Sequence, residues 1–562
     1  MRKYNRLLYR FDHPRWAMGS GILLALSLPP LGLYPLAWVA LVPLLVRWSY
    51  ERPGWSLLRE AYAAFLLTSS IMGFWVLFHE FTLTALLSGL GLLLLPLPFA
   101  VAVLAAGFIR ARFGLGAGLL AFVSFLLTAE FLLMHGPFAV PWLLLGHTQA
   151  DALPFNQIAD LGGVGLLSLW VLLLNVVALL GIRTVVRPGL LPGPRSLAAL
   201  TFVIVAMAPS AYGDWRRPEI ARAGDRLEVA VVQPAVPSSQ WADFTDGLRV
   251  ERLARLSDEF LAPGGHPRTA RAVAQEAGGR PDLLVWPESS LPIFDDAERQ
   301  RRLYARLSVW SAQRGVPLLT GAITRYDSAP APTAAPYEAR ATGSVTPYFN
   351  SALLFTPRTA PQQYDKVHPL PLVETIPFTR SSPLLRRLGP PAGGSPAYGT
   401  GRGPASFEVG SFRVGTVIGS ETLHGDHVRR LAPDADLLVA LVQNGWWGHS
   451  PGIAQHLRLS RLRAIEIRRA LIVAADNGAS SLILPDGTVK WSAGWMEEGL
   501  FRLRAPVLHT PTVYAAHGDW VGRGSGLLSG GLVLMWLGAL VFFRPPVPQT
   551  ARGKKRPMLV PA

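Results

Sequence analysis

Long apolar runs that carry almost no charge constrain the fold of this chain more than any other feature. Residues 16–46 contain no charged side chain, and further apolar blocks lie at about 61–109, 115–134, 161–182, 196–211 and 526–543. A helix of about 20 apolar residues crosses the hydrocarbon core of a bilayer. Only 16% of the residues are charged, well below the roughly 25% usual in soluble proteins. The sequence therefore predicts a multi-pass membrane protein.

The basic residues predict how these runs cross the membrane. Lys and Arg gather in alternate loops, at about 2–15, 47–59, 110–112, 183–195 and 544–556. The intervening loops at 29–34, 79–82 and 134–160 contain neither residue. Because cytoplasmic loops are enriched in Lys and Arg, this pattern predicts eight spans with both termini in the cytoplasm. Two of the spans form a short hairpin at 16–46, and the segment 212–525 lies outside.

Charge and cysteine content exclude several classes of function. The formal net charge of +16 does not indicate a nucleic-acid partner, because the basic residues follow the predicted membrane topology. The chain has no cysteine, which excludes disulfides, thiolate metal sites and an acyl thioester on the protein. His368 and His456 lack metal-ligand spacing, so we interpret them as hydrogen-bonded structural histidines. We predict neither a metal nor a cofactor.

Residues 212–525 have the pattern of an α/β domain, in which short aliphatic runs alternate with charged amphipathic stretches. Strands are predicted at LEVAVVQPAV, PDLLVWPESS, VPLLTGAIT, YFNSALLFTP, FEVGSFRVGTVIGSE, DADLLVALVQNGWWG and LIVAADNGASSLILPDGTVKW, and helices at TDGLRVERLARLSDEFL, ERQRRLYARLSVWSAQRG and PGIAQHLRLSRLRAIEIRRA. The predicted domains are 1–211 (seven spans), 212–525 (the α/β domain), 526–543 (the last span) and 544–562 (a basic tail).

Two features of this domain leave alternatives open. The Pro/Gly/Ala-rich segments 327–347 and 389–405 are predicted loops, and the sequence does not decide whether they are lids. The last predicted helix carries arginines that could meet phospholipid phosphates. The favoured interpretation is a solvated face that forms ion pairs with Glu466; the arginines are Arg461, Arg463, Arg468 and Arg469.

Polar residues suited to acyl transfer follow the ends of three predicted strands. Glu288 ends the strand PDLLVWPES, Lys366 follows YFNSALLFTP, and Gly419–Ser420–Glu421 ends FRVGTVI. In open sheets, side chains for chemistry gather where strands stop. A carboxylate can take a proton from a nucleophile, and a lysine can stabilise the oxyanion of a tetrahedral intermediate.

These motifs resemble those of the nitrilase superfamily and, within it, the apolipoprotein N-acyltransferase family. The matching segments include LALSLPPLGLYPLAW, PWLLLGHTQADALPFNQIADLGGVG, WPES, YDKVHPLPLVETIPF, QNGWWG and TVYAAHGDW, so the resemblance covers essentially the whole chain. It implies an α-β-β-α nitrilase-like sandwich with Glu288 as general base and Lys366 as catalytic lysine. It also implies supporting roles for Glu374, Glu421 and Trp446.

The resemblance further implies an activity and its setting. The family takes an acyl chain from a phospholipid and passes it to the N-terminal amine of an S-diacylglyceryl-cysteine lipoprotein. The expected partners are therefore phospholipid, diacylated lipoprotein and the bilayer. The expected location is the bacterial cytoplasmic (inner) membrane, with the catalytic domain on the periplasmic side and the protein a monomer. Acyl-chain and head-group preference are not predicted.

The elbow departs from the family pattern of cysteine, aromatic residue and glutamate. Gly419 occupies the position of the nucleophilic cysteine, and Asn444 stands where relatives usually carry aspartate. Three hypotheses stay open: Ser420 replaces the cysteine, Glu288 activates the acceptor amine or water directly, or the chain is an inactive relative that binds lipoprotein or lipid. A membrane-tethered amidase is a weaker alternative. On an extended strand Ser420 would face away from Gly419, unless the elbow has already turned.

Overall fold

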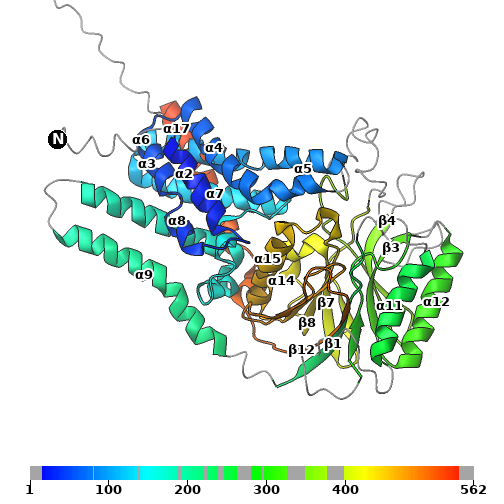
Figure 1. The fold of residues 1–562 in the computed structure, drawn as a ribbon. Coiled ribbons are helices and arrows are strands. Elements are labelled where there is room, and N and C mark those ends of the chain that lie inside the picture. The colour runs from blue at the N-terminus through cyan, green and yellow to red at the C-terminus, as the bar shows by residue number, and fades with distance from the viewer. Residues whose placement is uncertain are drawn as a thin grey trace, which may run out of the picture.

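The computed structural model consists of a helical bundle packed against a layered α/β domain (Figure 1). It describes residues 15–79, 82–136, 139–186, 192–218, 224–237, 246–261, 280–293, 296–325, 348–357, 359–375 and 398–542. The predictions for the loop 327–347, for the first part of the loop 389–405 and for the tail 544–562 lie outside these residues.

Six helical segments in the described residues are long and apolar enough to cross a membrane: Trp55–Phe78, Thr82–Phe113, Leu115–His135, Phe155–Thr184, Ser196–Arg216 and Trp520–Val541. They comprise α4 (Trp55–Gly73) with η2 (Phe74–Phe78), α5 (Thr82–Leu94) with α6 (Leu97–Phe113), α7 (Leu115–His135), η4 (Phe155–Ile158) with α8 (Ala159–Val186), α9 (Pro192–Arg216) and α17 (Trp520–Phe542). Many of their large apolar side chains are exposed, as lipid-facing positions require. A multi-pass membrane protein is thus supported.

The predicted hairpin at 16–46 consists of two shorter helices, α2 (Arg15–Ser27) and α3 (Val42–Tyr50). Their described lengths of 13 and 9 residues fall below the roughly 20 residues that a full crossing needs. The 3₁₀ helix η1 (Tyr34–Trp38) follows the turn between them. The exact count of eight spans therefore stays a prediction.

The α/β domain contains two six-stranded sheets. The first sheet has the order β12 (Gly499–Pro506), β1 (Arg226–Gln233), β2 (Leu283–Val285), β3 (Leu318–Arg325), β4 (Tyr348–Phe355) and β5 (Gln362–Asp365). The second has the order β11 (Val489–Ser492), β10 (Ser481–Ile483), β9 (Leu471–Ala475), β8 (Leu437–Val442), β7 (Phe412–Ile418) and β6 (Ser406–Val409). The strand β1 pairs antiparallel with β12 from Arg226↔Pro506 to Gln233↔Gly499, whereas the parallel pairing of β2 with β3 is short, from Leu284↔Leu318 to Val285↔Leu319.

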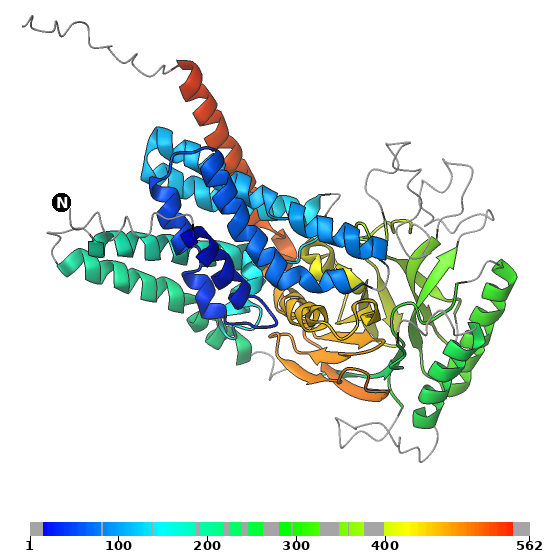
Figure 2. The same cartoon turned by 45° about the horizontal axis from the view of Figure 1, so that its top comes forward.

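The two sheets form the middle layers of an α-β-β-α sandwich. Val229 and Leu283 of the first sheet share one core with Val414 and Leu437 of the second. Helices α11 (Asp246–Leu261) and α12 (Ala297–Arg314) cover the first sheet, whereas α14 (Gly425–Arg429) and α15 (Pro451–Ile467) cover the second. The predicted α/β domain is therefore confirmed. Figure 2 shows α15 lying between its own sheet and the membrane helices.

The structure corrects the prediction that the arginines of α15 and its C-cap form a solvated face. The side chain of Arg468 is only 2% exposed and donates to Asp160 of α8 at 2.8 Å. Arg461 forms an ion pair with Asp151, which lies between η3 (Leu145–Gln149) and η4. Arg463 bonds Glu466 at 2.7 Å as predicted, but both side chains are buried, and Arg469 donates to backbone carbonyls. This face of α15 contacts the membrane helices, so the prediction of solvent exposure was wrong.

Candidate active site

The elbow after β7 turns at Gly419. The strand ends at Ile418, and Gly419 begins a short 3₁₀ helix, η6 (Gly419–Leu423), with φ of +53°. Glycine adopts this left-handed conformation without the steric penalty of a β-carbon. A β-carbon at this position would lie 3.1 Å from both Glu288 Oε2 and Lys366 Nζ. The α-carbon of Gly419 therefore faces the two predicted catalytic charges, and a β-carbon there would be in close contact with both.

Glu421 fixes the elbow against the segment that carries Lys366. Its buried carboxylate accepts hydrogen bonds from the backbone amides of Val367 at 2.6 Å and His368 at 3.1 Å. It also accepts from the Tyr364 hydroxyl at 2.8 Å and from the Ile418 amide at 2.9 Å. Burial alone would raise the pKa of Glu421, but His427, Lys366 and these donors outweigh it and lower the pKa. Glu421 is thus an ionised support of the elbow.

Glu288 is buried beyond the end of β2, where two donors fix both of its oxygens. The Asn350 side-chain amide donates to Oε1 at 2.7 Å, and the Gln443 backbone amide donates to Oε2 at 2.8 Å. The Lys366 ammonium lies 3.6 Å from Oε1. Burial raises the pKa of Glu288 despite this positive neighbour, and a raised pKa makes the carboxylate a stronger base.

Lys366 follows β5 and is 3% exposed. Its ammonium lies 2.9 Å from Glu374 Oε2 and donates to Oε1 at 3.0 Å. Burial lowers the pKa of Lys366, but the carboxylates of Glu374 and Glu288 outweigh it, so the net shift is upward. Glu374 also accepts from the Asn350 side chain at 3.0 Å. Lys366 is therefore a fixed cation, suited to stabilise a negative oxygen.

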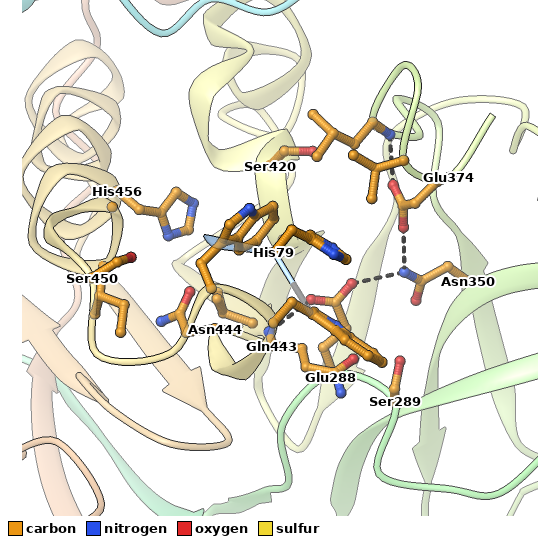
Figure 3. A pocket seen from close by; sticks show the side chains of 18 of the residues that line it. His79, Glu288, Ser289, Asn350, Glu374, Ser420, Gln443, Asn444, Ser450 and His456 are labelled. Carbon is orange, nitrogen blue, oxygen red and sulfur yellow. Dashed lines mark hydrogen bonds between the residues drawn. The ribbon is translucent and has the colours of Figure 1, made fainter. Parts of the chain in front are cut away.

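A cavity of about 130 Å³ joins these residues to the membrane helices. Trp75 and His79, at the end of the first long segment, line it opposite the α/β domain. The predicted Trp446 lies in η7 (Gly445–Trp447) and also lines it, with its ring parallel to His79 at 6.1 Å between centroids. Figure 3 shows Glu288, Asn350 and Glu374 linked by hydrogen bonds along one wall, with His456 across the cavity.

Ser420 lines the same cavity, because the turn at Gly419 ends the alternation of an extended strand. Its hydroxyl oxygen is buried and has no hydrogen-bond partner among the residues that the structure describes. The two oxygens of Glu288 instead accept from Asn350 and Gln443. The structure thus brings Ser420 to the site without a base in hydrogen-bond contact.

Several cavity residues were not identified from the sequence. Asn350 donates to both Glu288 and Glu374, and its signal was a polar side chain within the apolar strand β4. Gln443 acts through its backbone amide, which leaves no signal in the sequence. Trp75 and His79 reach the cavity only through the packing of the membrane helices onto the α/β domain.

His456 and Asn444 are two further polar groups around the cavity that the sequence analysis considered. His456 accepts or donates a hydrogen bond with Thr422 at 2.7 Å and stacks on Trp142, as expected for a structural histidine. Burial lowers the pKa of His456 to about 4. Asn444 donates its backbone amide to Asp476 at 2.8 Å, and burial raises the pKa of that carboxyl to about 7. Within the described residues, no group of three or more side chains is arranged to hold a metal ion.

The layered fold and its buried Glu–Lys pair define a carbon–nitrogen hydrolase domain attached to a membrane-helix bundle. The family model described as "Carbon-nitrogen hydrolase" matches residues 228–505, and "Apolipoprotein N-acyltransferase N-terminal domain" matches residues 20–177. With both domains present in this order, the chain belongs to the apolipoprotein N-acyltransferase family.

Known proteins resemble the chain over nearly its full length. It is 28% identical over 541 residues to an apolipoprotein N-acyltransferase of Chlorobaculum tepidum, covering 92% of this chain and 95% of that one. It is 29% identical over 560 residues to one of Bdellovibrio bacteriovorus, covering 94% and 93%. Among solved structures, a CN-hydrolase superfamily protein of Xanthomonas campestris has a TM-score of 0.32 and 18% identity, covering 50% of this chain and 91% of that one.

Proposed function

We propose that this protein transfers an acyl chain from a phospholipid to the N-terminal amine of an S-diacylglyceryl-cysteine lipoprotein. One observation carries the proposal: the cavity that holds Glu288 and Lys366 is also lined by Trp75 and His79, at the end of a membrane-spanning segment. Both substrates of such a reaction are lipids held in the bilayer, so a site at this junction can receive them without extracting them into water. The relatives that bear the name apolipoprotein N-acyltransferase support the same activity.

The proposed roles follow from the geometry. Glu288 takes the proton of the attacking group, since its oxygens are buried and its pKa is raised. Lys366 stabilises the negative oxygen of the tetrahedral intermediate, and Glu374 holds the ammonium in place at 2.9 Å. Glu421 supports the elbow at Gly419, and Trp446 lines the space for the acyl chain.

We propose the bacterial cytoplasmic membrane as the location, with 212–525 on the periplasmic side, both termini in the cytoplasm, and the domain limits 1–211, 526–543 and 544–562. Arg458 of α15 donates to the Pro30 carbonyl at the tip of the α2–α3 hairpin, at 2.7 Å. This contact supports the eight-span topology, in which the tip of the hairpin lies on the same side of the membrane as the α/β domain. A monomer remains our expectation.

A second candidate is a relative that binds lipoprotein or lipid without transferring the acyl chain. The observation that favours it is Gly419, which offers no side chain for an acyl intermediate. Ser420 does not replace it in this geometry, because its hydroxyl makes no hydrogen bond to Glu288 or to other described residues. The presence or absence of an N-acylated product distinguishes this binding protein from an enzyme that transfers the acyl chain by a changed mechanism.

An assay with a synthetic diacylated lipopeptide and phospholipid vesicles tests the proposal. The full chain, reconstituted in membranes, is expected to add one acyl chain to the peptide amine, detected by mass spectrometry. Glu288→Gln is expected to slow the reaction by about 10²- to 10⁴-fold, the usual contribution of a general base. Glu298→Gln, the same change on the exposed face of α12, is the matched control. Tight binding of the peptide without any acylated product would favour the second candidate.

A further inference from the structure

We propose that the acyl chain passes from phospholipid to acceptor in a single displacement, with both substrates bound together and no acyl-enzyme formed. This inference rests on the proposed function and concerns its order of steps. It departs from a two-step route, in which a side chain of the protein carries the acyl group between donor and acceptor.

The first observation is that no cavity side chain is prepared as a nucleophile. Gly419 has none. Among the described residues that line the cavity, the serines are Ser289, Ser420 and Ser450, and no hydrogen bond joins any of them to Glu288. A serine hydroxyl needs contact with a base to become nucleophilic. Lys366 is also unsuited, because its ammonium is ion-paired with Glu374 at 2.9 Å.

The second observation is that Gly419 faces the base and the cation together. A β-carbon built on Gly419 would lie 3.1 Å from both Glu288 Oε2 and Lys366 Nζ. Gly419, Glu288 and Lys366 all line the cavity. A reacting group in the cavity can therefore approach both charges past a position that carries no side chain.

The third observation is that the base and the cation are held rigidly although the nucleophile is absent. Asn350 bridges Glu288 and Glu374 at 2.7 and 3.0 Å, and the Gln443 amide fixes the second oxygen of Glu288. Buried charges are expensive to keep unless they are paired, and replacing such groups with apolar side chains is often neutral or stabilising. This rigid pair of base and cation is therefore suited to activating a group of a bound substrate rather than a side chain of the protein.

The bonds formed and broken in this reaction balance without an acyl intermediate on the protein. The neutral amine nitrogen attacks the ester carbonyl carbon of the phospholipid, forming the C–N bond, while Glu288 takes the amine proton. Lys366 donates a hydrogen bond to the carbonyl oxygen as it becomes negative. The C–O bond to the glycerol then breaks, and the protonated Glu288 returns its proton to the leaving oxygen. The products are the N-acylated lipoprotein and a lysophospholipid.

Initial-rate kinetics of the reconstituted full chain test this order. With phospholipid and diacylated lipopeptide varied together, double-reciprocal plots are expected to intersect. Incubation with acyl-labelled phospholipid alone is expected to leave no label on the chain. Parallel plots, or acyl label recovered on Ser420 by peptide mapping, would overturn the single displacement while leaving the proposed activity intact.

Gly419→Cys separates failure of the proposed mechanism from failure of the proposed substrates. The variant is expected to gain a hydroxylamine-labile acyl label, because a thiolate at this position would face Glu288 and Lys366. If the unsubstituted chain forms no N-acylated peptide but G419C does, the single displacement and acyl transfer by this protein are both overturned, and the proposed substrates of the site stand. If neither forms it, the proposed function and the single displacement both fail.

Discussion

At the scale of single residues, Asn350 connects the two carboxylates of the site. One side-chain amide group donates to both Glu288 and Glu374, and these carboxylates flank the Lys366 ammonium. Burial raises the pKa of Glu288, and the Lys366 ammonium and the Asn350 hydrogen bond both favour its ionised form. Asn350 therefore contributes to the pKa of the proposed base as well as to its orientation.

Asn350→Leu is expected to lower the rate of acyl transfer by about 10- to 100-fold, since a hydrogen bond to a charged group contributes roughly 1.5–3 kcal/mol. Losing a donor to the ionised carboxylate raises the pKa of Glu288 further. On the acidic side of the pH–rate profile, activity rises as Glu288 loses its proton. This limb should therefore move to higher pH. Gln363→Leu, on the exposed face of the neighbouring strand β5, is the control. An unmoved limb would contradict this role for Asn350.

At the scale of elements, α15 joins the α/β domain to the membrane helices. Asp160 near the start of α8 accepts from Arg468 at 2.8 Å, from Arg216 of α9 at 3.0 Å and from the Tyr212 hydroxyl at 2.8 Å. One carboxylate thus links α8, α9 and the C-cap of α15. Because both Asp160 and Arg468 are almost fully buried, the link depends on charge compensation rather than on solvent.

Asp160→Asn should destabilise the protein by about 3–5 kcal/mol, because it leaves buried arginines without their countercharge. We expect a lower temperature of thermal inactivation in detergent, together with dissociation of the α/β domain from the bundle as seen by protease sensitivity. Asp434→Asn, at a 63% exposed side chain, provides the matched control. Equal inactivation temperatures for the two variants would show that Asp160 does not hold the interface.

The limits of sequence-based prediction are clearest for these elements. Apolar runs and alternating patterns predicted the bundle and the α/β domain, since each depends on local sequence. Strand ends located Glu288 and Lys366, but the partner Asn350 became evident only when β4 was placed beside β3 and β5. The burial of Arg468 was missed because a helix with charged residues predicts exposure. Its face is covered here by another part of the same chain.

At the scale of the whole molecule, the topology predicts which surfaces meet the periplasm. The chain has no cysteine, so a single introduced cysteine provides the one thiol in the protein that a labelling reagent can modify. Arg301→Cys on α12 should react with a membrane-impermeant thiol reagent in intact spheroplasts. Arg52→Cys, in the exposed loop between α3 and α4, should react only after the membrane is opened. The reverse pattern would contradict the proposed orientation.

The central claim is that the cavity transfers acyl chains although it has no cysteine. The most direct measurement is the mass of the lipidated N-terminal peptide of a lipoprotein, made in cells depleted of their own N-acyltransferase. Expression of this chain is predicted to add the mass of one acyl chain, and Glu288→Gln is predicted to abolish that gain. If the peptide stays diacylated with this chain at normal membrane levels and becomes triacylated with Gly419→Cys, the claim is contradicted.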